Sequence, residues 1–346
     1  MTAVSWPSRL RASPELFPID LHPPTDQVAL LQLSRIDYEK ASFLDTRLEQ
    51  RPVLTPTFAE LAEAARGLPV ACDYIFHVGH VGSTLVSRLL GTHPKVFSLR
   101  EPMALRTLAQ AKAAREPWVA VERARRLAVF AALYSRTWLP DQRSLVKATS
   151  LVSGIAGELM ALEPGSRALS MTVGPETYLA TILGGPNSRV ELRATAPARL
   201  ARLNGRLGGP PWRIEDLAEG EQAAMSWACE MMALGAADDA TDGRMAWIDF
   251  DRFLADPIAG LTIALQALHG RADRAEVERL AASAYFQRYS KAPEYGYGPQ
   301  VRREVLAAAR HESGAEIARG LAWLDRAACH GPVAAALQRA ETIGVA

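Results

Sequence analysis

Residues 72–102 constrain the fold more than any other part of the sequence. A short apolar run at 74–78 is typical of a buried strand, and leucines recur at helical spacing from Leu85 onward. Between them lies a tight loop at 79–84 with the sequence GHVGST. Glycine lets a backbone turn sharply and approach a ligand closely, and the first amides of a helix attract anions. The stretch therefore predicts a phosphate-binding loop.

Strands and helices alternate along the rest of the chain. Apolar runs predict further strands at 95–99, 144–147, 167–173 and 245–250. Helical spacing predicts helices at 103–139 (broken near Pro117), 150–162, 176–183, 221–237, 258–268 and 274–284. Such alternation over short connections implies a parallel sheet covered by helices on both faces. The predicted fold is a three-layer α/β/α arrangement around a central, mainly parallel sheet.

The two ends of the chain are predicted to be appendages of this core. Residues 1–25 are rich in proline and lack periodicity, which indicates an irregular arm, whereas 26–48 and 57–66 read as helical. We therefore expect three parts. These are an N-terminal arm with helices at 1–69, the α/β domain at 70–290, and a C-terminal loop with two helices at 291–346.

Composition narrows the class of protein. The 346 residues carry a formal net charge of +1, so no basic field indicates a nucleic-acid partner. The N-terminus lacks the apolar core of a signal peptide, and no run approaches the ~20 apolar residues of a membrane span. The three cysteines are far apart and form neither a metal-type spacing nor a disulfide set, which favours the reducing cytoplasm. They are Cys72, Cys229 and Cys329.

Four stretches, in this order, resemble the P-loop sulfotransferase superfamily: the loop at 79–84, HPKVFSLREP, SLVKATS followed by EPGSRALSMTV, and WIDFDRFLADPIAGLTIALQAL. The resemblance covers roughly residues 70–290. It implies that 3′-phosphoadenylyl sulfate (PAPS) is the cofactor and that no metal is needed. It also implies transfer of a sulfuryl group to a hydroxyl or amine of a small-molecule or conjugate acceptor.

The resemblance also implies roles for individual residues. The loop would hold the 5′-phosphate side of PAPS, and His80 stands where the family has Lys or Arg. Glu101, at the carboxyl end of the second core strand, is the candidate base. The candidate catalytic residues are thus His80 and Glu101. The candidate cofactor-binding residues are Gly79, Gly82, Ser83, Thr84, Lys147, Thr181 and Arg193.

Two departures from the family pattern bear on activity. His80 replaces the permanent cation of the loop. The strand that usually ends in Arg-Asp-Pro, with an arginine for the 3′-phosphate, here ends in Val173-Gly174-Pro175. Thr181 matches the usual serine a turn later, and Arg189 and Arg193 are candidate replacements for the missing arginine. These departures leave open a second hypothesis, a catalytically inactive protein of the same fold that serves in binding or assembly.

The absence of a lysine after Gly82 disfavours a third hypothesis, a nucleotide kinase or phosphotransferase. Simpler interpretations of the same residues also stay open. The loop could be a tight turn that binds nothing, and Glu101 could be an ion-pair partner of Arg100 or Arg106.

Three further segments are candidates for the surroundings of the site. The Tyr- and Gly-rich loop at 289–299 is a candidate cover for the nucleotide. The N-terminal arm and residues 103–139 are candidate walls of the acceptor pocket. The sequence predicts neither the acceptor nor the oligomeric state.

Overall fold

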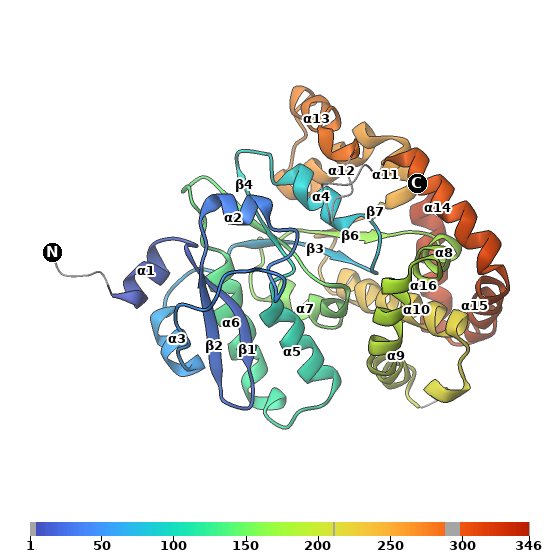
Figure 1. Ribbon diagram of the computed structural model, residues 1–346, viewed down its shortest axis with the longest axis horizontal. Coiled ribbons are helices and arrows are strands. Elements are labelled where there is room, and N and C mark those ends of the chain that lie inside the picture. Colours follow the sequence, from blue (N-terminus) through green and yellow to red (C-terminus); the bar gives the residue numbers. More distant parts are fainter. Residues whose placement is uncertain (1–4, 210–211, 288–297, 346) are drawn as a thin grey trace. The chain divides into compact units, whose positions relative to one another are not determined.

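A computed structural model describes residues 5–209, 212–287 and 298–345. Its central element is a five-stranded parallel sheet with the strand order β4-β5-β3-β6-β7 (Figure 1). The predicted α/β fold with a central parallel sheet is thereby confirmed. The strands are β3 (Cys72–His77), β4 (Val96–Arg100), β5 (Arg143–Lys147), β6 (Ala168–Thr172) and β7 (Met245–Asp249).

The predicted strands all overlap observed ones, and helices fill the intervals between them. α5 and α6 are separated near Pro117 as predicted, whereas the stretch predicted as one helix at 150–162 begins as a 3-10 turn. The C-terminal part has three helices, α14 to α16, where two were predicted. The helices and 3-10 turns from the loop onward are α4 (Ser83–Leu90), α5 (Met103–Ala113), α6 (Val119–Tyr134), η1 (Ser150–Ile155), α7 (Ala156–Ala161), α8 (Pro175–Gly184), α9 (Pro186–Leu207), η2 (Ile214–Asp216), α10 (Glu219–Asp239), α11 (Phe250–Ala255), α12 (Pro257–His269), α13 (Arg274–Ala281), η3 (Ala284–Gln287), α14 (Pro299–Glu312), α15 (Gly314–Ala327) and α16 (Gly331–Val345).

The N-terminal segment differs from the sequence prediction. After α1 (Trp6–Ala12), an antiparallel hairpin forms from β1 (Leu16–His22) and β2 (Gln27–Gln32), where an irregular arm and a helix were predicted. β2 is buried on both faces, and such a run shows no alternation that separates a strand from a buried helix. Only α2 (Arg35–Lys40) is helical in that stretch. The helix predicted at 57–66 is confirmed as α3 (Phe58–Ala64), which a Thr57–Glu60 capping box starts.

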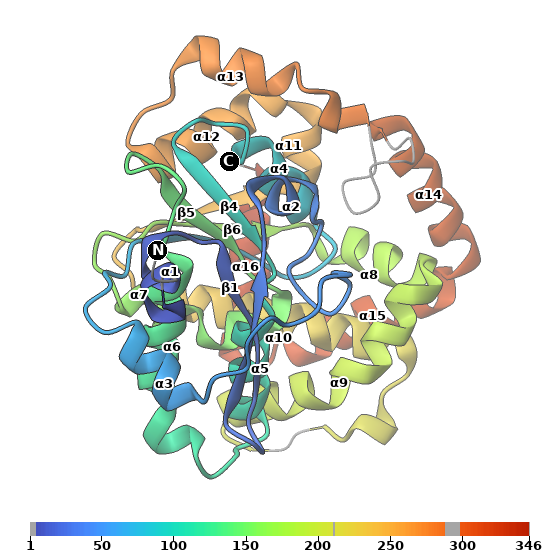
Figure 2. The ribbon, with the colours of Figure 1, turned by 60° about the vertical axis from the view of Figure 1, so that its left-hand side comes forward.

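The chain divides into two compact units, and β3 passes from one to the other between Ile75 and Phe76. The first unit comprises Met1–Ile75 and Thr84–Ala168. In it β1 of the hairpin packs on α5 and α6 (Figures 1 and 2). The Tyr134 hydroxyl donates to the Pro18 carbonyl at 3.0 Å. The N-terminal segment is therefore part of this unit's packing.

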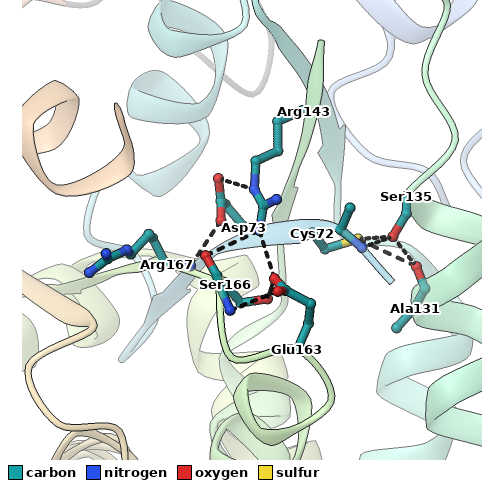
Figure 3. A network of polar contacts seen from close by, with 10 residues as sticks. Cys72, Asp73, Ala131, Ser135, Arg143, Glu163, Ser166 and Arg167 are labelled. Carbon is teal, nitrogen blue, oxygen red and sulfur yellow. Dashed lines mark hydrogen bonds and ion pairs between the residues drawn. The ribbon is translucent and has the colours of Figure 1, made fainter. Parts of the chain in front are cut away.

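A polar network holds the amino ends of β3 and β5 in the first unit (Figure 3). Arg143 lies 2.8 Å from the carboxylate of Asp73 and 3.0 Å from that of Glu163. Burial raises the pKa of Asp73, and Arg143 opposes this shift only in part. The pKa of Glu163 is lowered, because hydrogen bonds from Gly165 and Arg143 outweigh its own desolvation.

The second unit comprises Phe76–Ser83 and Leu169–Ala346. Its centre is α10, which packs against α8, α9, α15 and α16 (Figure 2). The methionine-rich side of α10 is buried core, as the spacing predicts. Glu230 of α10 is fully buried between Arg199 and Arg202 of α9, at 2.7 Å from each. Burial alone would raise the pKa of Glu230, but the charges of Arg202 and Arg199 outweigh it and hold the pKa below its ordinary value.

Candidate functional site

The loop between β3 and α4 has an unusual backbone. Three of its first four residues have positive φ angles: +107° at Gly79, +55° at His80 and +66° at Gly82. Positive φ angles let the backbone turn sharply directly after β3, as a loop that approaches a ligand closely requires. The helix that follows begins at Ser83, so the unpaired amides of its first turn lie at the same place. The loop thus combines a sharp turn with the free amides of a helix start, the features that the phosphate-binding prediction requires.

Gly82 is required sterically as well as conformationally. A Cβ at this position would overlap the ring of Phe250 from α11, which packs directly against the loop. The guanidinium of Arg302 lies over that ring, 5.0 Å from its centroid, and pairs with Asp251 at 2.6 Å. The ring of Phe250 therefore limits how closely the loop can approach α11.

The two hydroxyl residues of the loop are both buried. Ser83 is 4% exposed and Thr84 is 2% exposed. The Oγ1 atom of Thr84 finds no hydrogen-bond partner in the described part of the chain. A buried hydroxyl without a partner costs free energy, because it has given up its hydrogen bonds to water. A ligand oxygen at this position would remove that cost, so the residues present fit a bound phosphate.

His80 contacts two side chains of α9. Its Nδ1 atom lies 3.4 Å from the hydroxyl of Ser188, and its Nε2 atom lies 3.4 Å from a carboxylate oxygen of Glu191. The imidazole is 18% exposed and the Glu191 side chain is 54% exposed. Ser188 and Glu191 are three residues apart and share one face of the helix. Sequence reasoning missed both, because nothing in the order of residues links α9 to the loop.

Glu101 and Lys147 form an ion pair at the carboxyl ends of β4 and β5. Arg100 and Lys147 are register partners, and the Glu101 amide donates to the Lys147 carbonyl at 2.6 Å. Lys147 is 1% exposed, and the carboxylate of Glu101 partners its buried charge. The candidate base and a candidate cofactor ligand are thus each other's partners. Glu101, like His80, adopts a left-handed backbone, with φ of +56°.

The loop after α2 supplies two residues that the sequence did not single out. Arg47 stacks on the Phe43 ring at 3.4 Å from its centroid, and its guanidinium lies 4.0 Å from Glu101. The ammonium of Lys147 lies 5.7 Å from the same ring. Glu101 therefore has Lys147 and Arg47 as cationic neighbours, and the pairing with Arg100 or Arg106 considered from sequence does not form. The guanidinium of Arg100 donates to backbone carbonyls of residues 38–41 instead.

The residues considered for the 3′-phosphate lie on α8 and α9. The Thr181 hydroxyl donates to the Thr177 carbonyl at 2.8 Å. Arg193 is 64% exposed and pairs with Glu219 at 2.8 Å, and Arg189 pairs with the same carboxylate at 3.0 Å. Two guanidinium groups thus share one acid, which leaves a net positive charge on this face of α9.

At the end of β6, where the family has an arginine, the side chain of Val173 is buried. Its carbonyl accepts a hydrogen bond from the Trp227 indole at 3.1 Å. The residue that follows β6 therefore carries an apolar side chain in place of a cation, and a 3′-phosphate would need its cation from elsewhere.

The described residues hold neither a metal-type cluster nor a membrane span. No group of three or more His, Cys, Asp or Glu side chains among them is placed to hold a metal ion. Over the same residues, every helix is too short or too polar to cross a membrane. Of the loop predicted at 289–299, residues 289–297 lie outside the described residues.

Comparison with known proteins gives similarity at the level of solved structures. No family model matches the sequence, and no curated protein matches it. The sulfotransferase domain from the curacin biosynthetic pathway is similar with a TM-score of 0.40 and 14% identity, over 66% of this chain and 83% of that one. Sulfotransferase STF9 from Mycobacterium avium is similar with a TM-score of 0.41 and 13% identity, over 74% of this chain and 79% of that one. The sulfotransferase domain of the Synechococcus PCC 7002 olefin synthase is similar with a TM-score of 0.38 and 13% identity, over 69% of this chain and 87% of that one. Likenesses of this size assign no family and no activity.

Proposed function

We propose that this protein is a sulfotransferase-like enzyme. It binds the phosphate side of PAPS at the loop 79–84 and transfers a sulfuryl group to a hydroxyl or amine of a small acceptor. The observation that carries the proposal is the loop itself. It combines three residues with positive φ, a helix that starts at Ser83, and a buried Thr84 hydroxyl with no protein partner among the described residues. The sequence resemblance around this loop indicates that the anion is a phosphate of PAPS.

PAPS, once bound, supplies an activated sulfuryl group, and the chain's own residues do the rest. The loop amides with Ser83 and Thr84 hold the phosphate and stabilise the charge that grows on it as the sulfuryl group leaves. His80 provides positive charge on the loop when it is protonated. Glu101 accepts the proton of the acceptor, and its ion pair with Lys147 orients the carboxylate. Arg193, with Arg189, is the source of positive charge for the 3′-phosphate.

Binding of adenosine 3′,5′-bisphosphate tests the proposal. Saturating bisphosphate should raise Tm and release heat in calorimetry, because a ligand that binds only the native state stabilises it. AMP, which lacks the 3′-phosphate, should bind more weakly. Absence of both the Tm shift and the heat with bisphosphate would falsify the proposal.

The partnerless hydroxyl gives a matched pair of variants. Thr84→Val should leave the ligand-free protein as stable or more stable, and should weaken bisphosphate binding about tenfold or more, because a hydrogen bond to a charged group contributes roughly 1.5–3 kcal/mol. Ser170→Ala is the control. Its hydroxyl, on β6, is also buried without a partner among the described residues, but it lies outside the loop. It should alter stability without altering bisphosphate affinity.

A second candidate, a binding protein of the same fold without catalysis, is favoured by the apolar side chain of Val173 directly after β6. It predicts bisphosphate binding without any sulfuryl transfer from PAPS to an acceptor, and function in cells that survives Glu101→Gln. A nucleotide kinase is the weakest of the three candidates. Consumption of ATP in the presence of Mg²⁺, with no response to bisphosphate, would support it.

A further inference from the structure

His80 is the residue at which the loop departs most from the sulfotransferase pattern, and it lies against α9. A histidine is a weaker cation than lysine, since an unperturbed imidazole loses its proton near pH ~6.5. The structure places a hydroxyl and a carboxylate at its two ring nitrogens, 3.4 Å from Nδ1 and 3.4 Å from Nε2. The chemistry of these two partners determines what the ring can do.

The two partners have different hydrogen-bonding capacities. A carboxylate such as Glu191 only accepts, so Nε2 keeps its hydrogen whether the ring is neutral or charged. A hydroxyl such as Ser188 donates or accepts by rotation, so it suits Nδ1 in both states. The ring therefore gains and loses its proton at Nδ1, without a change of orientation. A nearby negative charge also favours the imidazolium form over the neutral one.

We propose that Glu191 and Ser188 are positioning residues that make His80 the cation of the loop, in place of lysine. Glu191 holds the imidazole protonated and oriented, and Ser188 keeps the orientation fixed while Nδ1 exchanges its proton. The inference rests on the proposed function, because it gives the charged ring the task of stabilising a phosphate bound at the loop.

Among the described residues, several charged groups of α9, α11 and α14 form ion pairs of their own. On α9, Arg189 and Arg193 both pair with Glu219. Arg302 of α14 pairs with Asp251 of α11 and lies over the ring of Phe250. Glu191 contacts the imidazole at 3.4 Å from Nε2, so its removal should act on His80 directly.

Titration of His80 followed by NMR tests the inference. The imidazole signal is assigned by its disappearance in His80→Asn, which separates it from the remaining histidines of the seven in the chain. Glu191→Gln should lower the titration midpoint of His80 by about half a pH unit or more, since the attraction of an opposite charge is lost. Glu191→Asp should restore part of the shift. Ser188→Ala should move the midpoint less than Glu191→Gln does.

The same variants are then compared by bisphosphate binding as a function of pH. In the native protein, affinity should fall as pH rises through the His80 midpoint, and in Glu191→Gln the fall should occur at lower pH. Glu176→Gln is the matched control: Glu176 is a 56% exposed carboxylate on the neighbouring helix α8, paired with Arg310, and should change neither readout.

The outcomes separate the inference from the proposed function. An unchanged His80 midpoint in Glu191→Gln overturns the inference, whether or not bisphosphate binds. A lowered midpoint with no bisphosphate binding in any variant contradicts the proposed function and supports the pairing of Glu191 with His80. A lowered midpoint together with a binding profile that moves with it supports both.

Discussion

Lys147 is buried at the end of β5, and its ammonium pairs with the carboxylate of Glu101, a residue in the left-handed region at φ of +56°. The Glu101 amide also donates to the Lys147 carbonyl at 2.6 Å. Glu101 is thus tied to Lys147 by backbone and side chain at once. A left-handed backbone at a non-glycine residue costs roughly 1–2 kcal/mol, and such strain persists where the surroundings enforce it, often at functional sites.

The first prediction is that replacing one member of this pair lowers the free energy of unfolding more than replacing the other. Glu101→Gln should lower the free energy of unfolding by about 3 kcal/mol, because it leaves the ammonium of Lys147 buried without its carboxylate. Lys147→Met should cost only about 1 kcal/mol, because it replaces a buried charge by an apolar chain while Glu101 keeps some solvent and Arg47. Urea denaturation measures both values, and the double variant should show a coupling above about 1 kcal/mol. Equal losses for the two single variants would contradict the prediction.

The same pair should separate catalysis from nucleotide binding. If Glu101 is the base, Glu101→Gln lowers kcat by about 10²–10⁴-fold, while the affinity for adenosine 3′,5′-bisphosphate is unchanged. Sulfuryl transfer from PAPS and calorimetry with the bisphosphate provide the two readouts. A parallel loss of both would assign Glu101 to cofactor binding or to folding and not to proton transfer.

The loop, the alternation of strands and helices and the helix break near Pro117 could be predicted from sequence, because each depends on residues close together in the chain. The β1–β2 hairpin could not, because β2 is buried on both faces and therefore lacks the period of two. For the site, the sequence proposed Glu101 and Lys147 as separate candidates, because each lies at the carboxyl end of a predicted parallel strand, where ligands bind. The contacts of Glu191 with His80 and of Phe250 with Gly82 join segments far apart in the chain, and no local pattern records them.

The backbone of His80 gives a second prediction. His80→Gly should keep or raise stability by up to about 1 kcal/mol, because glycine adopts positive φ without strain, although it also loses the ring contacts. His80→Val should lose about 1–2 kcal/mol, since a β-branched residue is disfavoured there. Both should weaken bisphosphate binding. Asp242→Gly is the control, because Asp242 also has positive φ, at +49°, and lies outside the site. It should change stability alone.

Gly82 gives a third prediction. Gly82→Ala should lower the free energy of unfolding by about 2–3 kcal/mol, because the new Cβ overlaps the Phe250 ring and the backbone φ is +66°. Bisphosphate binding should be lost as the loop shifts. Replacement of Phe250 by leucine in the same chain should recover part of the stability, since it removes the ring atoms that clash. No recovery in Gly82→Ala/Phe250→Leu would mean that the backbone angle, and not the overlap, accounts for the loss.

The network around Arg143 gives a fourth prediction, in the pH dependence of stability (Figure 3). The pKa of Asp73 is raised by burial above 3.8, so the native state keeps this proton at pH values where the unfolded chain has lost it. Asp73 therefore makes the free energy of unfolding decrease as pH rises from 3.8 through its folded-state pKa. The pKa of Glu163 is lowered below 4.5, so stability from Glu163 is present above 4.5 and lost as pH falls through its folded-state pKa.

Urea denaturation across the acid range, from about pH 3 to about pH 6, measures both contributions. Asp73→Asn should remove the decrease in stability with rising pH, and Glu163→Gln should remove the increase. The two variants should therefore change the profile in opposite directions, because one carboxyl has its pKa raised and the other has it lowered in the folded state. Changes of the same sign would show that Arg143 does not hold the two carboxylates as the structure indicates.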